Sequence, residues 1–475
     1  MQNRRMFLAT ASAAIVSGAT GWLDLFDGST LNGWKTGGNP GSWTVKDGHL
    51  VGSGPASHLF YTSRSFKNFE FEGEVLTRPG CNSGIYFHTA FQEGGFPKKG
   101  FEVQVNNTAL GEGTYRERKR TGSLYSIRNV PQQLARDNEW FRIAIAVRGK
   151  NIQVRVNGML TVDYTEPATP VLPPTQETGR FLGEGLFALQ CHDAGSLVQF
   201  RGLRVRTLGD SEATPEALPE VDETYRKIIT LGAKNYPLVD WHVHLKPGLG
   251  VKEALEKSKR DGIYYGIAAN CGRQSQYNTE AGALGFIDSV RGHAAYVGMQ
   301  AEGADWMKIF GAKVTDRVDF IFNDGMIWTD DSGRWTRLYR PQDIGPIANA
   351  DALVDELVER TVHLLTKTPM DILAIPTFLP DSISKDHARL WTPARMRRLV
   401  DAAASRQVAI EMNDRYRLPN LAFLRMAKEA GCKFVLGTGN SAVNDLKRSE
   451  FGLEMIGELK LAWTDLWVPT RSAII

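Results

Sequence analysis

Short stretches in which apolar and polar residues alternate dominate the chain up to about residue 208. The clearest of them cover residues 42–45, 69–75, 83–88, 100–105, 140–147, 152–156 and 198–205. A period of two is typical of β-strands with one buried face. No long segment with the 3.6-residue period of a helix interrupts them. The pattern therefore predicts an all-β sandwich or barrel for this part of the chain.

The pattern changes after residue 221, where short apolar runs alternate with helical periods. The apolar runs cover 238–245, 264–269, 295–300, 318–322, 371–375, 408–412 and 433–436. Helical periods cover 251–260, 352–365, 392–406 and 421–430. Strands connected by crossover helices predict a parallel α/β barrel, here with seven strands, and in such barrels the chemistry lies at the C-terminal strand ends.

The segment between these two parts is polar and contains two prolines, which is typical of a linker. We therefore divide the chain into a sandwich over residues 22–208, a linker over 209–220 and a barrel over 221–475. A short helix is expected from Asp222 to Leu231, where the barrel domain begins.

The first 19 residues have the layout of an export signal, with Arg4 and Arg5 before a short apolar stretch and small residues near Ala19. The paired arginines indicate the twin-arginine type, and an ordinary secretory signal with two arginines is the alternative. No later run reaches the length of apolar residues that spans a bilayer. The expected location is periplasmic or extracellular, without a membrane span.

Charge and cysteine usage exclude several classes of function. The formal net charge is +3, and the densest basic run, residues 115–120, is interrupted by Glu117, so we expect a solvated loop there and no nucleic-acid binding. The absence of a Cys-x-x-C pair argues against a zinc ribbon. Cys81 and Cys191 form either a disulfide or two buried thiols.

Alternation also predicts which side chains share a face of the sandwich. It places Tyr86 with His88, Glu102 with Gln104, and Gln190 with His192, each pair opposite apolar neighbours. A solvated sheet face would show the same alternation. Histidine, glutamine and tyrosine suit a surface that binds sugar hydroxyls, so a carbohydrate cleft is the favoured interpretation.

Several motifs in this region resemble the 3-keto-disaccharide hydrolase family, which is also described as 3-keto-glucoside lyase and 3-keto-glucal hydratase. The matching segments are 23–34, 82–88, 101–104, 121–125, 138–140, 156–158, 185–192 and 198–201. The resemblance implies a concanavalin-like jelly-roll sandwich. The chain departs from the family at His88, where many members have arginine, and at Asn106 and Asn107, where an acidic residue is common.

The resemblance implies cleavage of a 3-keto-glycoside, in which the C3 ketone acidifies the proton on C2. Such a site needs a base, an acid for the leaving oxygen and donors for the enolate. Glu102 or His88 is the expected base, and His192 the acid or enolate donor. Side chains expected to orient the sugar are Gln104, Tyr125 and Gln190. No second carboxylate is evident beside Glu102 for an ordinary glycosidase mechanism.

A separate dehydrogenase must supply the 3-keto group, because this chain has no glycine motif for NAD.

Polar side chains also follow the predicted barrel strands. They include His242 and His244, an arrangement that is common at metal sites because both rings enter one cavity. A pair of buried, hydrogen-bonded histidines is the alternative.

The Asp240–His244 motif and the seven strands resemble the PHP (polymerase and histidinol phosphatase) superfamily of metal-dependent phosphoesterases. The chain departs from its motifs at 270–271, 375–376 and 437–440. The remaining candidate ligands are His242, His244, Glu302, Asp324 and Glu411. This set suits one divalent metal ion or a metal-free binding pocket, and not a trinuclear phosphoesterase site.

Three functions are therefore weighed. The leading one is an exported enzyme that cleaves 3-keto-glycosides by elimination across C1 and C2, by hydration, or by both as a net hydrolysis. The second is a sugar-binding sandwich that targets a metal-dependent hydrolase or phosphoesterase in the barrel. The third is a cell-surface or assembly protein without chemistry. The partner expected in the first two cases is a carbohydrate.

Overall fold

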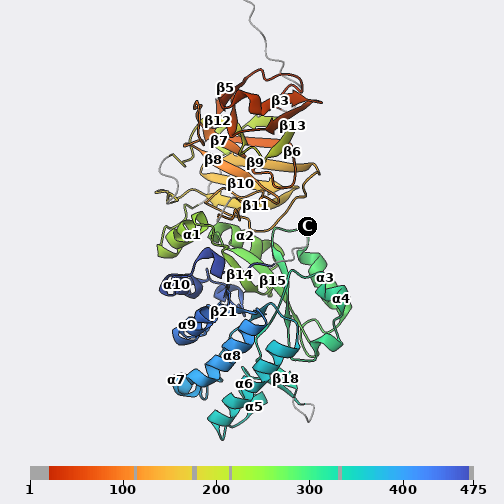
Figure 1. Cartoon of the computed structure of the whole chain (residues 1–475), viewed down its shortest axis with the longest axis vertical. Coiled ribbons are helices and arrows are strands. Elements are labelled where there is room, and N and C mark those ends of the chain that lie inside the picture. The colour runs from red at the N-terminus through yellow and green to blue at the C-terminus, as the bar shows by residue number, and fades with distance from the viewer. Residues whose placement is uncertain (1–20, 112–114, 174–178, 213–216, 330–333, 470–475) are drawn as a thin grey trace, which may run out of the picture.

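The computed structural model describes residues 21–111, 115–173, 179–212, 217–329 and 334–469. The predicted export signal over residues 1–19 lies outside them. Two units are stacked along the long axis of the molecule, an all-β unit first in the chain and an α/β unit second (Figure 1).

The first unit is a sandwich of two antiparallel sheets. Its strands are β1 (Trp22–Asp24), β2 (Trp34–Gly38), β3 (Trp43–Lys46), β4 (His49–Ser53), β5 (Ser57–Phe66), β6 (Phe69–Thr77), β7 (Ser83–Thr89), β8 (Phe101–Val105), β9 (Phe141–Arg148), β10 (Asn151–Val156), β11 (Met159–Thr165), β12 (Gly185–Cys191) and β13 (Leu197–Thr207). The larger sheet has the order β11-β10-β9-β6-β13-β4-β3, with β1 also paired to β13, and the smaller sheet has the order β2-β5-β12-β7-β8.

Apolar side chains from the two sheets meet between them. In β6, buried and half-buried residues alternate along the whole strand, because one face packs against the core and the other faces outward. Every residue of β7 and β8 is buried, because loops cover the outer face of the smaller sheet. This covered face is where the candidate active site lies.

The predicted sandwich is confirmed, and all seven strands predicted from alternation are present. The structure adds strands that the pattern did not predict, of which β5 is the longest. Residues His58 to Tyr61 of β5 are buried on both faces, so polar and apolar positions do not alternate there.

The second unit contains a closed barrel of seven parallel strands, which confirms that prediction; its relation to the PHP superfamily stays an expectation. The strands are β14 (Val239–Val243), β15 (Tyr264–Cys271), β16 (Tyr296–Ala301), β17 (Phe320–Asn323), β20 (Ile372–Leu373), β21 (Ala409–Asn413) and β22 (Phe434–Gly437). A separate hairpin joins β18 (Ile327–Thr329) and β19 (Trp335–Arg337).

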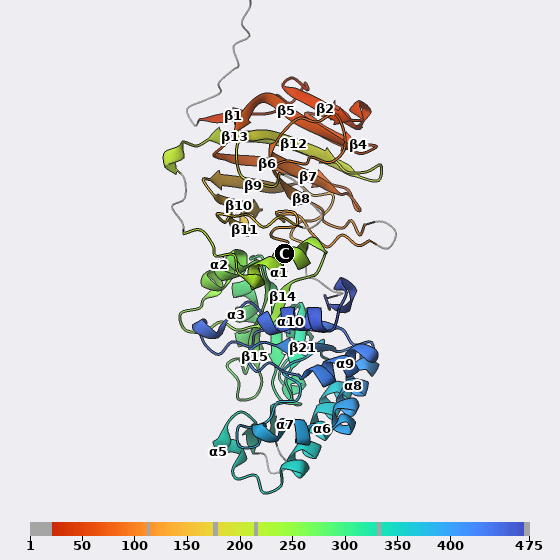
Figure 2. The same ribbon diagram turned by 90° about the vertical axis from the view of Figure 1, so that its left-hand side faces the viewer.

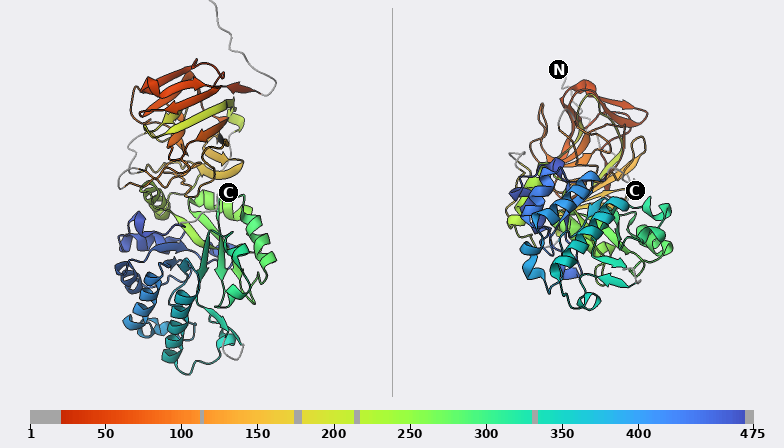
Figure 3. Two further views of the ribbon diagram at one scale, coloured as in Figure 1. Left: turned by 45° about the vertical axis from the view of Figure 1, so that its right-hand side comes forward. Right: turned by 60° about the horizontal axis from the view of Figure 1, so that its bottom comes forward.

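Helices surround the barrel strands (Figure 3). They are α1 (Glu223–Ala233), α2 (Val251–Asp261), α3 (Glu280–Val290), α4 (Ala312–Thr315), α5 (Pro341–Ile344), α6 (Ala350–Lys367), α7 (His387–Leu390), α8 (Pro393–Ser405), α9 (Leu421–Glu429) and α10 (Glu450–Glu458). Asp222 caps α1 by accepting a hydrogen bond from the Tyr225 amide, so the helix begins where the linker ends.

The two units pack closely against one another, with α2 against β11 (Figures 1 and 2). Arg128, from the sandwich, donates to the carbonyl oxygens of Lys259 at 3.2 Å and Arg260 at 3.0 Å, at the C-terminal end of α2. A guanidinium at this position satisfies carbonyl groups that lack partners within the helix and faces the negative end of its dipole.

All four cysteines are buried free thiols, so Cys81 and Cys191 do not form a disulfide in this structure. None of the helices in the described ranges is long and apolar enough to cross a membrane.

Candidate active site

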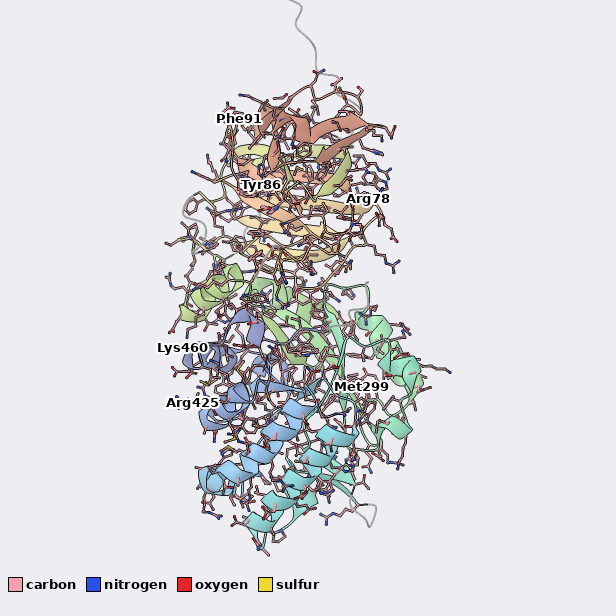
Figure 4. The ribbon with its side chains drawn as sticks, viewed as in Figure 1. Arg78, Tyr86, Phe91, Met299, Arg425 and Lys460 are labelled. Atoms are coloured by element: carbon pink, nitrogen blue, oxygen red, sulfur yellow. The ribbon has the colours of Figure 1, made fainter. Side chains whose placement is uncertain are left out.

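A cavity of about 170 Å³ lies on the covered face of the smaller sandwich sheet. It is lined by Asn82, Tyr86, Phe96, Glu102, Gln104, Glu117, Tyr125, Arg180, Gln190 and His192. Figure 4 labels Tyr86, which lies on strand β7 of this sheet, between β12 and β8. The structure therefore brings together all but one of the sandwich residues predicted to form the site. The exception is His88.

Strand register positions the floor of the cavity. Tyr86 of β7 lies opposite Glu102 of β8, and Gly84 lies opposite Gln104. A side chain at Gly84 would collide with Glu102, because an added Cβ atom would lie 2.4 Å from its Oε1. The glycine thus provides the space that the Glu102 carboxylate occupies.

Glu102 is the buried carboxylate at the centre of the cavity. Burial raises its pKa above the ordinary value, and the nearby charge of Glu117 raises it as well. Arg180 and the hydrogen bond from Tyr86 act in the opposite direction. A carboxylate whose pKa is raised while it stays close to cationic and hydrogen-bonding groups suits a general base.

Arg180 is a cation in this cavity that sequence reasoning missed. It is 7 % exposed, and no group of the described residues forms a hydrogen bond with its Nη1. A buried guanidinium nitrogen without a partner is costly. It therefore marks the position where an oxyanion of a ligand would be stabilised.

Gln190 links two buried rings on the cavity floor. Its Nε2 donates to the Tyr86 hydroxyl at 3.0 Å and lies 3.4 Å from Nε2 of His58. Burial, together with the charge of His192, lowers the pKa of His58 to about 4, so this ring is neutral at pH 7. The amide is held in place and can orient a sugar hydroxyl through its remaining atoms.

His192 lies at the rim, where its Nδ1 is 2.8 Å from Oδ2 of Asp193. This contact fixes the ring orientation and leaves Nε2 free for a ligand. The Phe96 ring, 51 % exposed, lies 5.3 Å from the His192 ring and 5.6 Å from the His58 ring. An exposed aromatic face at the mouth of a polar cavity suits the apolar face of a sugar ring.

Glu117 is a second carboxylate in the cavity, which corrects the expectation that Glu102 has none beside it. It accepts hydrogen bonds from Tyr115 at 2.7 Å, from Tyr125 at 3.1 Å and from the Lys119 amide at 2.9 Å. Glu117 and Lys119 are both buried, so the prediction of a solvated loop over 115–120 is wrong at these positions.

The predicted shared face of Tyr86 and His88 is wrong. His88 has a φ of 53°, which breaks the alternation, and its ring packs against the core rings of Phe69 and Phe87. Its Nε2 lies 2.8 Å from the Lys67 carbonyl oxygen, and its Nδ1 accepts from the Gly183 amide at 3.2 Å. His88 is thus a buried structural histidine outside the cavity lining.

Asn106 and Asn107, the other departure from the family pattern, are also buried and do not line the cavity. Oδ1 of Asn106 accepts from the Ala109 backbone amide, and Nδ2 of Asn107 donates to Oγ1 of Thr77. Both side chains stabilise the loop that follows β8.

In the barrel, both predicted histidines are buried and hydrogen-bonded. His242 Nδ1 lies 2.7 Å from Oε1 of Glu411, and His244 Nδ1 lies 3.0 Å from the Ala268 carbonyl oxygen. Burial lowers the pKa of His242, but the charge and hydrogen bond of Glu411 outweigh it and raise the pKa above the ordinary value.

The other three candidate ligands are engaged with protein groups. Glu411 also accepts from the Ile375 amide at 2.6 Å, Asp324 accepts from Gln300 at 3.0 Å, and Glu302 accepts from Asn270 at 3.0 Å. In the part of the chain that the structure describes, no group of three or more His, Cys, Asp or Glu side chains is placed to hold a metal ion. As placed, these residues do not fit a metal, and we assign no step to one.

The cavity residues that the sequence missed lie outside regular strands. Asn82 precedes β7, and Phe96, Glu117 and Arg180 come from loops. Alternation predicts faces within strands only. A single cation in a short segment between two glycines, such as 179–183, gave no pattern that singled it out.

Comparison with known proteins bears on the sandwich alone. Residues 21–206 match the family described as 3-keto-alpha-glucoside-1,2-lyase-like domain. A 3-keto-disaccharide hydrolase from Bacteroides thetaiotaomicron is 28% identical over 237 residues, which cover 40% of this chain and 79% of that protein.

Two solved structures show likeness over the same part of the chain. One is a protein from Parabacteroides distasonis described as a glycosyl hydrolase, with 22% identity, a TM-score of 0.35, and coverage of 40% of this chain and 94% of that one. The other is a carbohydrate-binding module from Bacillus subtilis, with 15% identity, a TM-score of 0.24, and coverage of 38% and 98%.

Proposed function

We propose that the sandwich cleaves 3-keto-glycosides by elimination across C1 and C2, followed by addition of water. The observation that carries this proposal is the pairing, in one sugar-sized cavity, of the buried carboxylate of Glu102 with the buried guanidinium of Arg180, whose Nη1 has no partner among the described residues. The family match over residues 21–206 supports the choice of a 3-keto sugar.

The first step removes the proton on C2 of the sugar. Glu102 accepts this proton, and the electron pair moves onto the C3 oxygen as an enolate. Arg180, whose Nη1 has no partner in the part of the chain that the structure describes, stabilises that oxygen. Because the ketone makes this proton acidic, the mechanism does not need the two opposed carboxylates of an ordinary glycosidase.

The second step breaks the bond between C1 and the glycosidic oxygen. The enolate electrons form the C1–C2 double bond, and Nε2 of the protonated His192 donates a proton to the leaving oxygen. Asp193 holds this ring in position through its Nδ1. The products are the free aglycone and a 2-hydroxy-3-keto-glucal.

Addition of water moves the protons of Glu102 and His192 in the opposite direction. The water oxygen bonds to C1, its proton goes to His192, and Glu102 returns a proton to C2. The resulting 3-keto sugar and the aglycone are the products of a net hydrolysis. Gln190 and Gln104 orient the sugar, and Phe96 covers one of its faces.

Variants of Glu102 and Arg180 test the proposal on a 3-keto-α-glucoside with a chromophoric aglycone. We expect Glu102→Gln to lower kcat/KM by about 10²–10⁴-fold, the range for loss of a general base. Because the base must be ionised, kcat/KM rises with pH through the raised pKa of Glu102. Arg180→Met removes a charge that lowers this pKa, so its acidic limb moves to higher pH.

The glucal separates elimination from direct hydrolysis. Elimination followed by hydration passes through the 2-hydroxy-3-keto-glucal, so the enzyme should hydrate this compound to the 3-keto sugar, whereas direct displacement at C1 never forms it. Failure to hydrate the added glucal, or full activity in Glu102→Gln, would contradict the mechanism.

A further inference from the structure

The segment that carries Glu117 lies at the junction between the two units and is held from the barrel side. Asn235 follows α1 in the barrel unit and is 5 % exposed. Its Nδ2 donates to the Arg116 carbonyl oxygen at 2.6 Å, and its Oδ1 accepts from Lys119 Nζ at 2.5 Å. The Asn235 side chain thus forms hydrogen bonds to the segment on both sides of Glu117.

We infer that the barrel completes the sandwich cavity: Asn235 is a positioning residue that, through Arg116 and Lys119, sets the place of Glu117 beside Glu102. This inference rests on the proposed function of the cavity and extends it to the second unit. The barrel would then contribute to the reaction by positioning a cavity residue, without carrying out a chemical step itself.

A continuous series of contacts connects Asn235 with the cavity. Lys119 Nζ lies 3.5 Å from Oε1 of Glu117 and 4.6 Å from the centre of the Tyr125 ring. Oε2 of Glu117 accepts the Tyr125 hydroxyl at 3.1 Å. A change at Asn235 therefore reaches two side chains of the cavity through hydrogen bonds.

The charge of Glu117 connects this series of hydrogen bonds to the proposed base, Glu102. Burial is the main cause of the raised pKa of Glu102, and the negative charge of Glu117 raises it further, so the position of Glu117 contributes to the strength of Glu102 as a base. Burial lowers the pKa of Lys119, and the charges of Glu117 and Glu102 raise it. The barrel contributes an uncharged amide, Asn235, which accepts a hydrogen bond from the ammonium group and so favours its charged form.

Asn235 can be changed without strain to the backbone. Its φ is 68°, a conformation that glycine adopts freely, so Asn235→Gly removes the side chain alone. Tyr264→Phe is the matched control, because it removes another hydrogen bond between the units, from the Tyr264 hydroxyl to Gln132 at 2.6 Å. Neither Tyr264 nor Gln132 lines the cavity.

The first measurement is hydrogen exchange of the full-length chain. In Asn235→Gly we expect backbone amides around residues 117–125 to exchange about tenfold faster or more, while Tyr264→Phe leaves them as in the wild type. Unchanged exchange in Asn235→Gly would overturn the inference. This readout does not depend on turnover, so it stays decisive even if the wild type does not cleave 3-keto-glucosides and the proposed function fails.

The second measurement is the pH profile of kcat/KM. Asn235→Gly leaves Glu117 without its anchor beside Glu102, and the charge of Glu117 raises the pKa of Glu102. We therefore expect kcat/KM to fall about tenfold and the acidic limb, which reports the ionisation of Glu102, to move to lower pH. An unmoved acidic limb in Asn235→Gly, or an equal shift in Tyr264→Phe, would contradict a role of Asn235 through Glu117.

Discussion

At the scale of single residues, the cavity depends on where a side chain is absent as much as on where one is present. Gly84 leaves the space that Glu102 fills, and the other members of the floor follow strand register. A carboxylate confined in this way stays at a fixed distance from Arg180 and from Tyr86, and both of these residues affect its pKa. The position of Glu102 should therefore be sensitive to a single added methyl group.

Gly84→Ala tests this sensitivity. Because the new Cβ atom would lie 2.4 Å from Oε1 of Glu102, the carboxylate must move, and we expect kcat/KM to fall about 10²-fold. Steady-state kinetics would measure the loss. Gly183→Ala is the control, since its added Cβ atom has nothing within 4 Å and should leave kcat/KM as it is. Equal activity in both variants would show that Glu102 has more room than the structure gives it.

Prediction from sequence worked for residues within strands and failed for residues beside them. Glu102, Gln104, Gln190 and His192 line the cavity as alternation indicated. His88 does not, because one residue with positive φ turns its side chain toward the core. The pattern of polar and apolar residues does not indicate a positive φ at a single position of a strand.

At the scale of elements, loops over the smaller sheet make a polar sheet face into a cavity. The loop between β7 and β8 is held by Gln92, whose Nε2 donates to the carbonyl oxygens of Gly94, Gly95 and Phe96. Its Oε1 accepts from the Lys98 amide at 3.2 Å. This single side chain organises the loop that places Phe96 over the mouth of the cavity.

Gln92→Ala should therefore weaken sugar binding through Phe96. We expect KM to rise several-fold with little change in kcat, the pattern for lost binding that is equal in the ground and transition states. Phe96→Ala should have a similar effect, and the double variant should be no worse than Phe96→Ala alone. Additive effects in KM would mean that the loop acts by contacts other than this ring.

Strand prediction was complete for the closed barrel and partial for the sandwich, and the pattern did not indicate helices α3 and α10. Buried parallel strands and amphipathic helices alternate regularly after residue 221, and each strand expected there is present in the closed barrel. In the sandwich, β5 was not predicted, because residues 58–61 are covered on both faces. The same covering that creates the candidate site thus hides one of its strands from pattern analysis.

At the scale of the whole molecule, the two units share a closely packed boundary. Arg128 is 6 % exposed, and its guanidinium lies 5.1 Å from the centre of the Tyr164 ring and 5.4 Å from that of Tyr225. It connects β11, α1 and the end of α2. Linker composition describes the chain between units and carries no information about the surfaces that meet.

Arg128→Ala should loosen this boundary. It leaves two helix-end carbonyl groups without their partner and uncovers two rings, so we expect the free energy of unfolding to fall by about 2–4 kcal/mol. Thermal and urea unfolding of the full-length chain would measure the change. Arg128→Lys keeps the charge and should lose less, and a melting temperature within a degree of wild type in Arg128→Ala would contradict a stabilising role for this contact.

The hydrogen bonds from Asn235 to residues 116–119 also have a consequence for the order in which the two units fold. The ribosome makes the sandwich first, and all of its strands have been synthesised before Asn235 is added to the growing chain. Glu117 reaches its final place only after α1 has docked beneath the sandwich. The cavity is thus unfinished in the nascent protein, and competence to turn over a sugar should arise late, together with the folding of the barrel.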